Sequence, residues 1–196
     1  MFRFLLGIVL GVLILPLAVM LWFHLGNVPV AVADPQLPEE RFITSVPLNA
    51  RIHREMIGNP PIQANDAAFS AGAQVYTDNC AVCHGFQGKP SALGASMFPD
   101  APQLLQKHHN GDVVGVSDDP PGETYWKVYN GIRLTGMPAF KTQLSETEMW
   151  QVSLLLANAD KQMPPAVQSV LRGEGTPAEA DTTPASRAKT TAPAKH

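Results

Sequence analysis

Two cysteines and a histidine stand close together in the middle of the chain, at Cys80, Cys83 and His84. The pattern Cys-x-x-Cys-His is typical of covalent attachment of a c-type haem. Cysteines at this spacing can form thioether bonds to the two vinyl groups of one porphyrin, and the adjacent histidine then reaches the iron as a proximal ligand. The chain contains 2 Cys in all, so one haem would use both.

Three other kinds of site use similar residues. A thioredoxin-like dithiol has the Cys-x-x-Cys spacing, but it needs a βαβ context that this sequence does not show. A zinc site needs a second ligand pair at a suitable spacing, whereas His108 and His109 are adjacent. These two histidines are also iron ligands in principle, although the polar sequence around them favours a surface turn. A disulfide across two intervening residues is uncommon, so haem attachment is the favoured interpretation.

A second iron ligand is predicted at Met137, in the sequence Gly136-Met137-Pro138. Methionine with histidine is a known axial pair for haem iron, and the thioether raises the reduction potential. Pro138 restricts the backbone of Met137 to extended conformations. Met97 is the main competitor for this role, and core packing is the common alternative role of any methionine.

Helical patterns flank these candidate ligands. A helix is predicted from Asp66, which can cap it, because apolar residues follow at helical spacing. A second is predicted over 121–130, with proline at its start and Gly131 as a stop. A capping box over 145–148 opens a third, which ends before Pro164. No stretch alternates with period two for long, so the sequence predicts an all-α fold.

Taken together, the motifs resemble the class I cytochrome c domain. The resemblance is carried by Gly72-x-x-x-Tyr76-x-x-x-Cys80-x-x-Cys83-His84-Gly85 and by Asn130-Gly131-x-x-x-x-Gly136-Met137-Pro138, and it covers about residues 66–161. It implies a cytochrome c fold of a few helices around one covalent haem c, with thioether links at Cys80 and Cys83. It also implies that His84 and Met137 bind the iron, and that Gly72 and Tyr76 lie where the first helix crosses the last, near Trp150.

An uncharged apolar run extends from Phe4 to Phe23. Twenty helical residues span roughly 30 Å, the thickness of a bilayer core. Arg3 precedes the run and the next formal charge is Asp34, so the positive-inside rule predicts export of everything that follows. A cleaved signal peptide ending at Ala31-Val32-Ala33 is the alternative, but the run is longer than a typical signal core. An uncleaved anchor is favoured, as in membrane-anchored monohaem cytochromes of bacteria, which this layout resembles.

Four parts of the chain are predicted. Residues 1–33 form the anchor or signal segment, and 34–65 form a proline-containing arm in which we expect no long helix, at most a short one near 50–57. Residues 66–172 form the cytochrome c domain. Residues 173–196 have no aromatic side chain and almost no large aliphatic one, so we expect this tail to be disordered.

Haem propionates need hydrogen-bond donors, and Tyr125, Trp126 and Arg133 are candidates because their side chains suit a carboxylate. The alternative is that the aromatic residues only pack on the porphyrin and that Arg133 is a solvated charge. An acidic stretch over 112–123 is either a docking patch for a basic redox partner or a solvated loop.

With both axial positions filled, the iron offers no open site to a substrate. The predicted function is therefore electron transfer by a membrane-bound carrier that is not itself an enzyme. It acts either alone or as a subunit of an oxidoreductase complex, and it exchanges electrons with a cytochrome, oxidase or dehydrogenase on the periplasmic side. A soluble periplasmic carrier follows if the signal is cleaved. The net charge of -3 argues against nucleic acid as a partner. A haem sensor or small-ligand binder with a labile sixth ligand is the alternative, and a haem peroxidase is less favoured.

Overall fold

The computed structural model describes residues 1–107, 111 and 113–175. The chain separates into two compact units, Met1–Leu48 and Asn49–His196. Within the described part the structure is helical, and its β-type pairing is limited to two isolated bridges. The prediction of an all-α fold is confirmed. His108, His109, Asp112 and most of the predicted disordered tail lie outside the described residues.

The first unit contains helix α1 (Phe2–Leu25), which includes Pro16. Its most apolar stretch has a mean hydropathy of 2.9 and is not buried against any other part of the described chain. By length and composition this helix is able to cross a membrane, and a signal sequence near the N-terminus has the same properties.

The arm contains a longer helix than the sequence predicted. Helix α2 (Glu40–Glu55) has 16 residues and includes Pro47, so the expectation of no long helix in this region was wrong. Proline removes one backbone donor and crowds the carbonyl four residues earlier. The remaining backbone amides still form helical hydrogen bonds. Glu40 in the first turn and the basic residues His53 and Arg54 in the last turn also interact favourably with the helix dipole.

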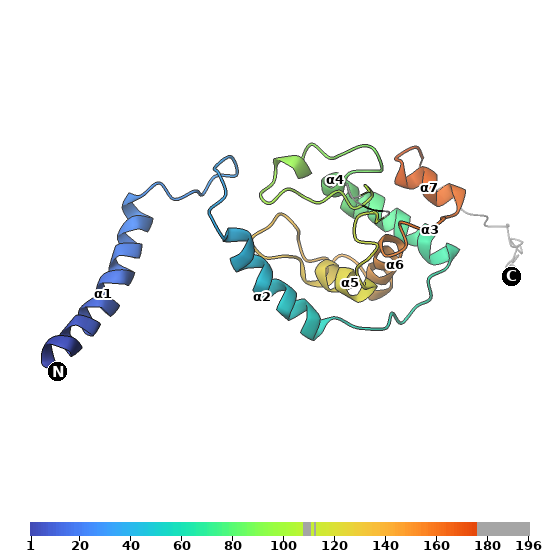
Figure 1. Ribbon diagram of the computed structural model, residues 1–196. Coiled ribbons are helices and arrows are strands. Elements are labelled where there is room, and N and C mark those ends of the chain that lie inside the picture. The colour runs from blue at the N-terminus through green and yellow to red at the C-terminus, as the bar shows by residue number, and fades with distance from the viewer. Residues whose placement is uncertain (108–110, 112, 176–196) are drawn as a thin grey trace, which may run out of the picture. The chain divides into compact units, whose positions relative to one another are not determined.

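The second unit holds the remaining helices, among which α3 and α5 both pack on α6 and α7 packs on α3 (Figure 1). They are α3 (Asp66–Val75), the π-helical turn η1 (Tyr76–Cys80), α4 (Ala81–His84), the 3-10 turn η2 (Gly94–Ser96), α5 (Pro121–Asn130), α6 (Glu146–Leu156) and α7 (Pro165–Leu171). The three predicted helices correspond to α3, α5 and α6. Helix α7, which follows Pro164, was not predicted as a separate element.

The core forms where α3 crosses α6. Gly72 lies at the crossing, and a Cβ atom there would collide with the main-chain oxygen of Gln151, so the absence of a side chain permits the close approach. Tyr76 is 0% exposed and Trp150 2%. Tyr125 of α5 stacks on Trp150 with ring centroids 4.2 Å apart. The predicted crossing near Trp150 is confirmed.

Local capping fixes where the two central helices begin. Helix α6 starts at the predicted capping box, in which the Ser145 amide donates to Glu148 Oε2 at 2.8 Å and the Glu148 amide donates to Ser145 Oγ at 3.3 Å. Helix α3 is capped one residue earlier than predicted, since Asn65 Oδ1 accepts from the Ala68 amide at 2.9 Å. Asp66 instead lies in the first turn, where its negative charge interacts favourably with the positive end of the helix dipole.

Candidate functional site

The Cys-x-x-Cys-His motif spans a change of helix type. Cys80 ends the π-helical turn η1, and Cys83 and His84 lie in the single turn of α4. Residues three apart in a helix share a face, so the two sulfur atoms project to the same side. Neither cysteine is in a disulfide. Burial, with a smaller contribution from Cys83, raises the pKa of the Cys80 thiol to about 12, so this thiol is neutral at physiological pH.

His84 is held in one tautomer by the main chain. Its Nδ1 lies 2.8 Å from the carbonyl oxygen of Pro102. A carbonyl only accepts, so Nδ1 donates its proton and Nε2 keeps the lone pair that binds a metal. Burial lowers the pKa of His84, partly opposed by this hydrogen bond, and so favours the neutral imidazole that can act as a ligand.

The segment after His84 is tied back to α3. Gly85 turns the chain with φ +69°, and a Cβ atom there would come within 2.5 Å of the Lys89 oxygen. The buried hydroxyl of Tyr76 donates to the Gly85 oxygen at 2.7 Å. Burial also raises the pKa of Tyr76, so this donor keeps its proton. The bond fixes the end of α4, and with it the position of His84, against the core.

A closed loop after α5 presents Met137. Helix α5 ends at Asn130, and the next residue, Gly131, caps it with φ +66°. The Ile132 amide then donates to the Met137 oxygen at 3.2 Å. Thr135 Oγ1 donates to the Ile132 oxygen at 2.7 Å and accepts from the Met137 amide at 3.1 Å. These bonds order the backbone on both sides of the methionine.

The structure brings all four sequence-predicted ligands to the wall of one cavity of about 220 Å³. Its lining is mostly apolar and comes from η1, α4, α5, α6 and the two loops around residues 97–104 and 132–140. Met97, the competing methionine, lines the same cavity, and its sulfur lies 2.7 Å from where a Cβ atom of Gly136 would be. Both candidate thioethers are therefore available at this site.

The residues of this cavity fit a haem. An apolar wall with one imidazole nitrogen, thioether sulfur and two thiols supplies the attachment and axial groups that haem c uses. A structural zinc site needs four nitrogen or sulfur ligands, and no group of three or more His, Cys, Asp or Glu residues suited to a metal ion gathers among the described residues. The wall also contains an unpartnered buried hydroxyl, Thr124 Oγ1, which a polar edge of the cofactor could satisfy.

The candidate propionate donors from the sequence do not line this cavity. The Trp126 indole donates to Glu55 Oε2 at 2.9 Å, Tyr125 stacks in the core, and Arg133 is exposed. Thr124 and Lys127 of the same helix line the cavity instead. Sequence reasoning missed both, although their three-residue spacing, continued by an apolar residue at 128, is the signal of one helix face.

The acidic stretch is partly occupied by internal ion pairs. Lys127 Nζ lies 2.7 Å from Glu123 Oε1 and 3.6 Å from Asp119 Oδ2. Burial raises the pKa of Asp119, an effect that Lys127 opposes and that Glu123 and Asp118 increase. These carboxylates therefore neutralise a lysine beside the cavity, which a purely solvated loop would not do.

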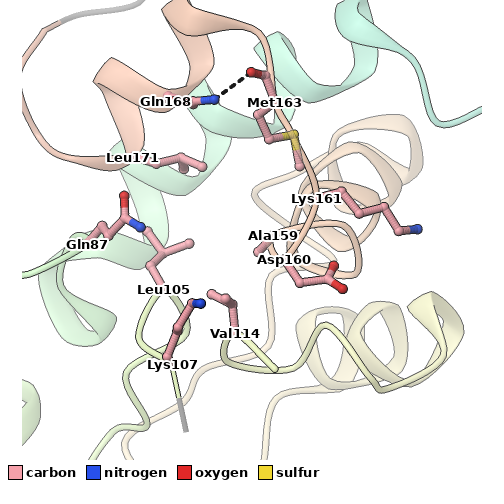
Figure 2. Close-up of a pocket in the computed structure, with 10 residues that line it drawn as sticks. All are labelled: Gln87, Leu105, Lys107, Val114, Ala159, Asp160, Lys161, Met163, Gln168 and Leu171. Carbon is pink, nitrogen blue, oxygen red and sulfur yellow. Dashed lines mark hydrogen bonds between the residues drawn. The ribbon is translucent and has the colours of Figure 1, made fainter. Parts of the chain in front are cut away.

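A second cavity, of about 240 Å³, lies between the segment after α6, helix α7 and the chain around Leu105 (Figure 2). Gln168 Nε2 donates to the Met163 oxygen at 2.8 Å at its edge. None of the described residues that line it is a cysteine or a histidine.

Comparison with known proteins finds a family match inside the second unit. Residues 67–154, just under half of the chain, match the family described as cytochrome C oxidase, cbb3-type, subunit III. No curated protein and no solved structure matches the chain. The matched segment begins in α3 and ends in α6, and so includes the Cys-x-x-Cys-His motif, the Met137 loop and the helix crossing. The match supports a class I c-type cytochrome domain over these residues, a type of domain associated with haem-based electron transfer.

Proposed function

We propose that the chain binds one haem c through thioether bonds at Cys80 and Cys83, with His84 and Met137 as axial ligands, and that it carries electrons between redox proteins. One observation carries the proposal: these four residues line a single apolar cavity, although Cys80 and Met137 are 57 positions apart in the sequence. An apolar cavity of this kind suits a porphyrin, and an imidazole and a thioether are suitable axial donors.

When bound, haem supplies a one-electron couple between ferrous and ferric iron. The chain's own groups prepare for it. Pro102 holds His84 so that Nε2 is free to bind, and the Thr135 hydroxyl orders the backbone of Met137. The apolar wall excludes water, which disfavours the additional positive charge of ferric iron and so raises the potential.

The proposed location is the outer face of the cytoplasmic membrane. Helix α1 supports it, because its stretch from Phe4 to Phe23 carries no charge and is long enough to cross a bilayer. The single Arg3 on its N-terminal side favours a cytoplasmic N-terminus. A redox protein of the same membrane system, such as a cytochrome, an oxidase or a dehydrogenase, is the proposed partner.

Covalent attachment is the direct test. The full chain is produced with a c-type haem maturation system, and haem is stained after denaturing electrophoresis. The wild type should retain haem, the single variants Cys80→Ala and Cys83→Ala should retain less, and the double variant should retain none. Met163→Leu serves as the control, because Met163 is another sulfur-containing side chain of the same unit that does not line this cavity. Retention of haem by the double variant would contradict the proposed attachment.

A further inference from the structure

Thr124 is exceptional among the hydroxyl-bearing helix residues that the structure describes. It is 6% exposed, and its Oγ1 has no hydrogen-bond partner. The hydroxyls of Thr77 and Ser153 instead donate to the carbonyl oxygens four residues earlier, at 2.9 and 2.7 Å. A buried hydroxyl without a partner destabilises the protein. Since Thr124 lines the haem cavity, a group inside that cavity is the available partner.

Lys127 lies on the same side of α5, three residues further along, and lines the same cavity. Its side chain is 24% exposed and pairs with Glu123 and Asp119. Neither carboxylate is among the cavity-lining residues, so the lysine lies between an acidic pair on one side and the cavity on the other. The helix therefore offers a neutral donor and a cation to one ligand.

The other polar side chains of the wall are already engaged or have the wrong charge. Asn79 donates to the Val75 oxygen at 3.0 Å, Thr135 to Ile132, and His84 to Pro102. Asp100, which also lines the cavity, is an acceptor when ionised and repels an anion. The polar end of an acidic ligand is therefore best received on α5.

We propose that Thr124 and Lys127 bind a carboxylate inside this cavity, the propionate edge of the haem. The proposal rests on the proposed function, because propionates are the anionic groups of this cofactor. The Thr124 hydroxyl donates a hydrogen bond to the carboxylate, and the Lys127 ammonium partly neutralises the negative charge of the carboxylate. Both interactions reduce the preference of the iron for the ferric state, so the two residues act as positioning and potential-setting groups.

The hydroxyl is tested with Thr124→Val, which keeps the shape of the side chain and removes the donor. Thr124→Ser restores the donor, and Thr147→Val is the control, because Thr147 is exposed on α6 away from the cavity. The midpoint potential of each full-length holoprotein is measured by spectroelectrochemistry over a range of pH. We expect Thr124→Val to lower the potential at neutral pH, and Thr124→Ser and Thr147→Val to leave it near the wild-type value.

The pH range identifies the acceptor. A lost donor raises the pKa of a carboxylate, and at pH values below that pKa the group is neutral in every variant. The potentials of Thr124→Val and the wild type should therefore converge at low pH. If they are equal at every pH, or if a constant difference persists at low pH, the hydroxyl does not serve a carboxylate and the proposal is wrong.

The cation is tested with a charge-balanced variant. Lys127→Gln alone leaves Glu123 and Asp119 without their cation, so the double variant Glu123→Gln/Lys127→Gln removes the shorter ion pair without changing the net charge. A lower midpoint potential in the double variant supports a cation that faces the cavity, and an unchanged potential excludes it. Haem staining of the same samples separates the two levels of failure: an unstained wild type contradicts the proposed function, whereas a stained protein with unmoved potentials contradicts only this inference.

Discussion

The indole Nε1 of Trp126 on α5 donates to Oε2 of Glu55 on α2 at 2.9 Å. Arg51 pairs with the same carboxylate at 2.9 Å and lies 6.0 Å from the centroid of the Trp126 ring. Ile52 between them is 1% exposed. The end of α2 precedes the family match, which starts at residue 67, and it packs on α5, the helix that forms one wall of the proposed haem cavity.

This contact should stabilise the domain. We expect Trp126→Phe and Glu55→Gln each to lower the Tm of the holoprotein by a few degrees, and the double variant to lower it by less than the sum, because one removes and the other weakens the same hydrogen bond. Glu39→Gln is the matched control on an exposed carboxylate of the first unit. Additive effects in the double variant would show that the two side chains are not coupled.

The same contact predicts a pH dependence. Hydrogen bonds from Trp126 and Arg51 lower the pKa of Glu55 from its ordinary value of 4.5. A carboxylate with a lowered folded-state pKa contributes stability above its unfolded-state pKa and loses it as the pH falls through the folded-state pKa. The difference in Tm between wild type and Glu55→Gln should therefore be full at neutral pH and decrease below about pH 4.5. A difference that grows on acidification would exclude this origin.

The identity of the sixth ligand is decided by comparing the two methionines of the cavity. Met137→Leu should abolish the ferric sulfur–iron band near the red end of the visible spectrum and lower the potential by roughly 0.1 V or more, since axial ligation spans about 0.8 V. Met97→Leu should keep the band. If Met97→Leu removes the band and Met137→Leu does not, then Met97 is the ligand and the assignment is reversed.

The close crossing of α3 and α6 predicts that adding one carbon atom at Gly72 destabilises the domain. Gly72→Ala places a Cβ atom against the main-chain oxygen of Gln151, and backbone gives way less readily than a side chain. We expect a loss of about 1–3 kcal/mol in the free energy of unfolding, the usual cost of overpacking. Gly58→Ala is the control, because nothing lies within 4 Å of the added atom there. Equal chemical denaturation midpoints for the two variants would contradict the close crossing.

The N-terminal helix predicts the mass and location of the mature protein. We expect the chain to be recovered from the membrane fraction in detergent, with an intact mass that includes α1 and one haem. A mass that begins at Asp34 and a soluble periplasmic protein would instead show cleavage after Ala33. The same mass spectrum also shows whether one haem has been added, so cleavage of the N-terminal segment and attachment of the haem are measured independently.

The sequence alone determined the features that depend on neighbours along the chain. The spacing of Cys80, Cys83 and His84 sets which atoms share one helical turn, and this spacing is visible without a structure. The capping box at Ser145 and the glycine stop at Gly131 were predicted for the same reason, because caps are satisfied within a few residues. Pro47 misled the prediction for the arm, since one missing donor does not prevent a helix whose remaining amides are paired.

Only the tertiary structure decided which side chains face the cavity. The Trp126 indole was a plausible propionate donor until the fold brought Glu55, 71 residues away, to its nitrogen. The orientation of His84 likewise depends on a carbonyl 18 residues further along. The elements packed against a helix decide which of its faces is buried in the core. Tyr125 therefore packs on Trp150 in the core, whereas Thr124 and Lys127 line the cavity. Local sequence specifies the groups and their spacing, whereas long-range packing assigns each group its partner.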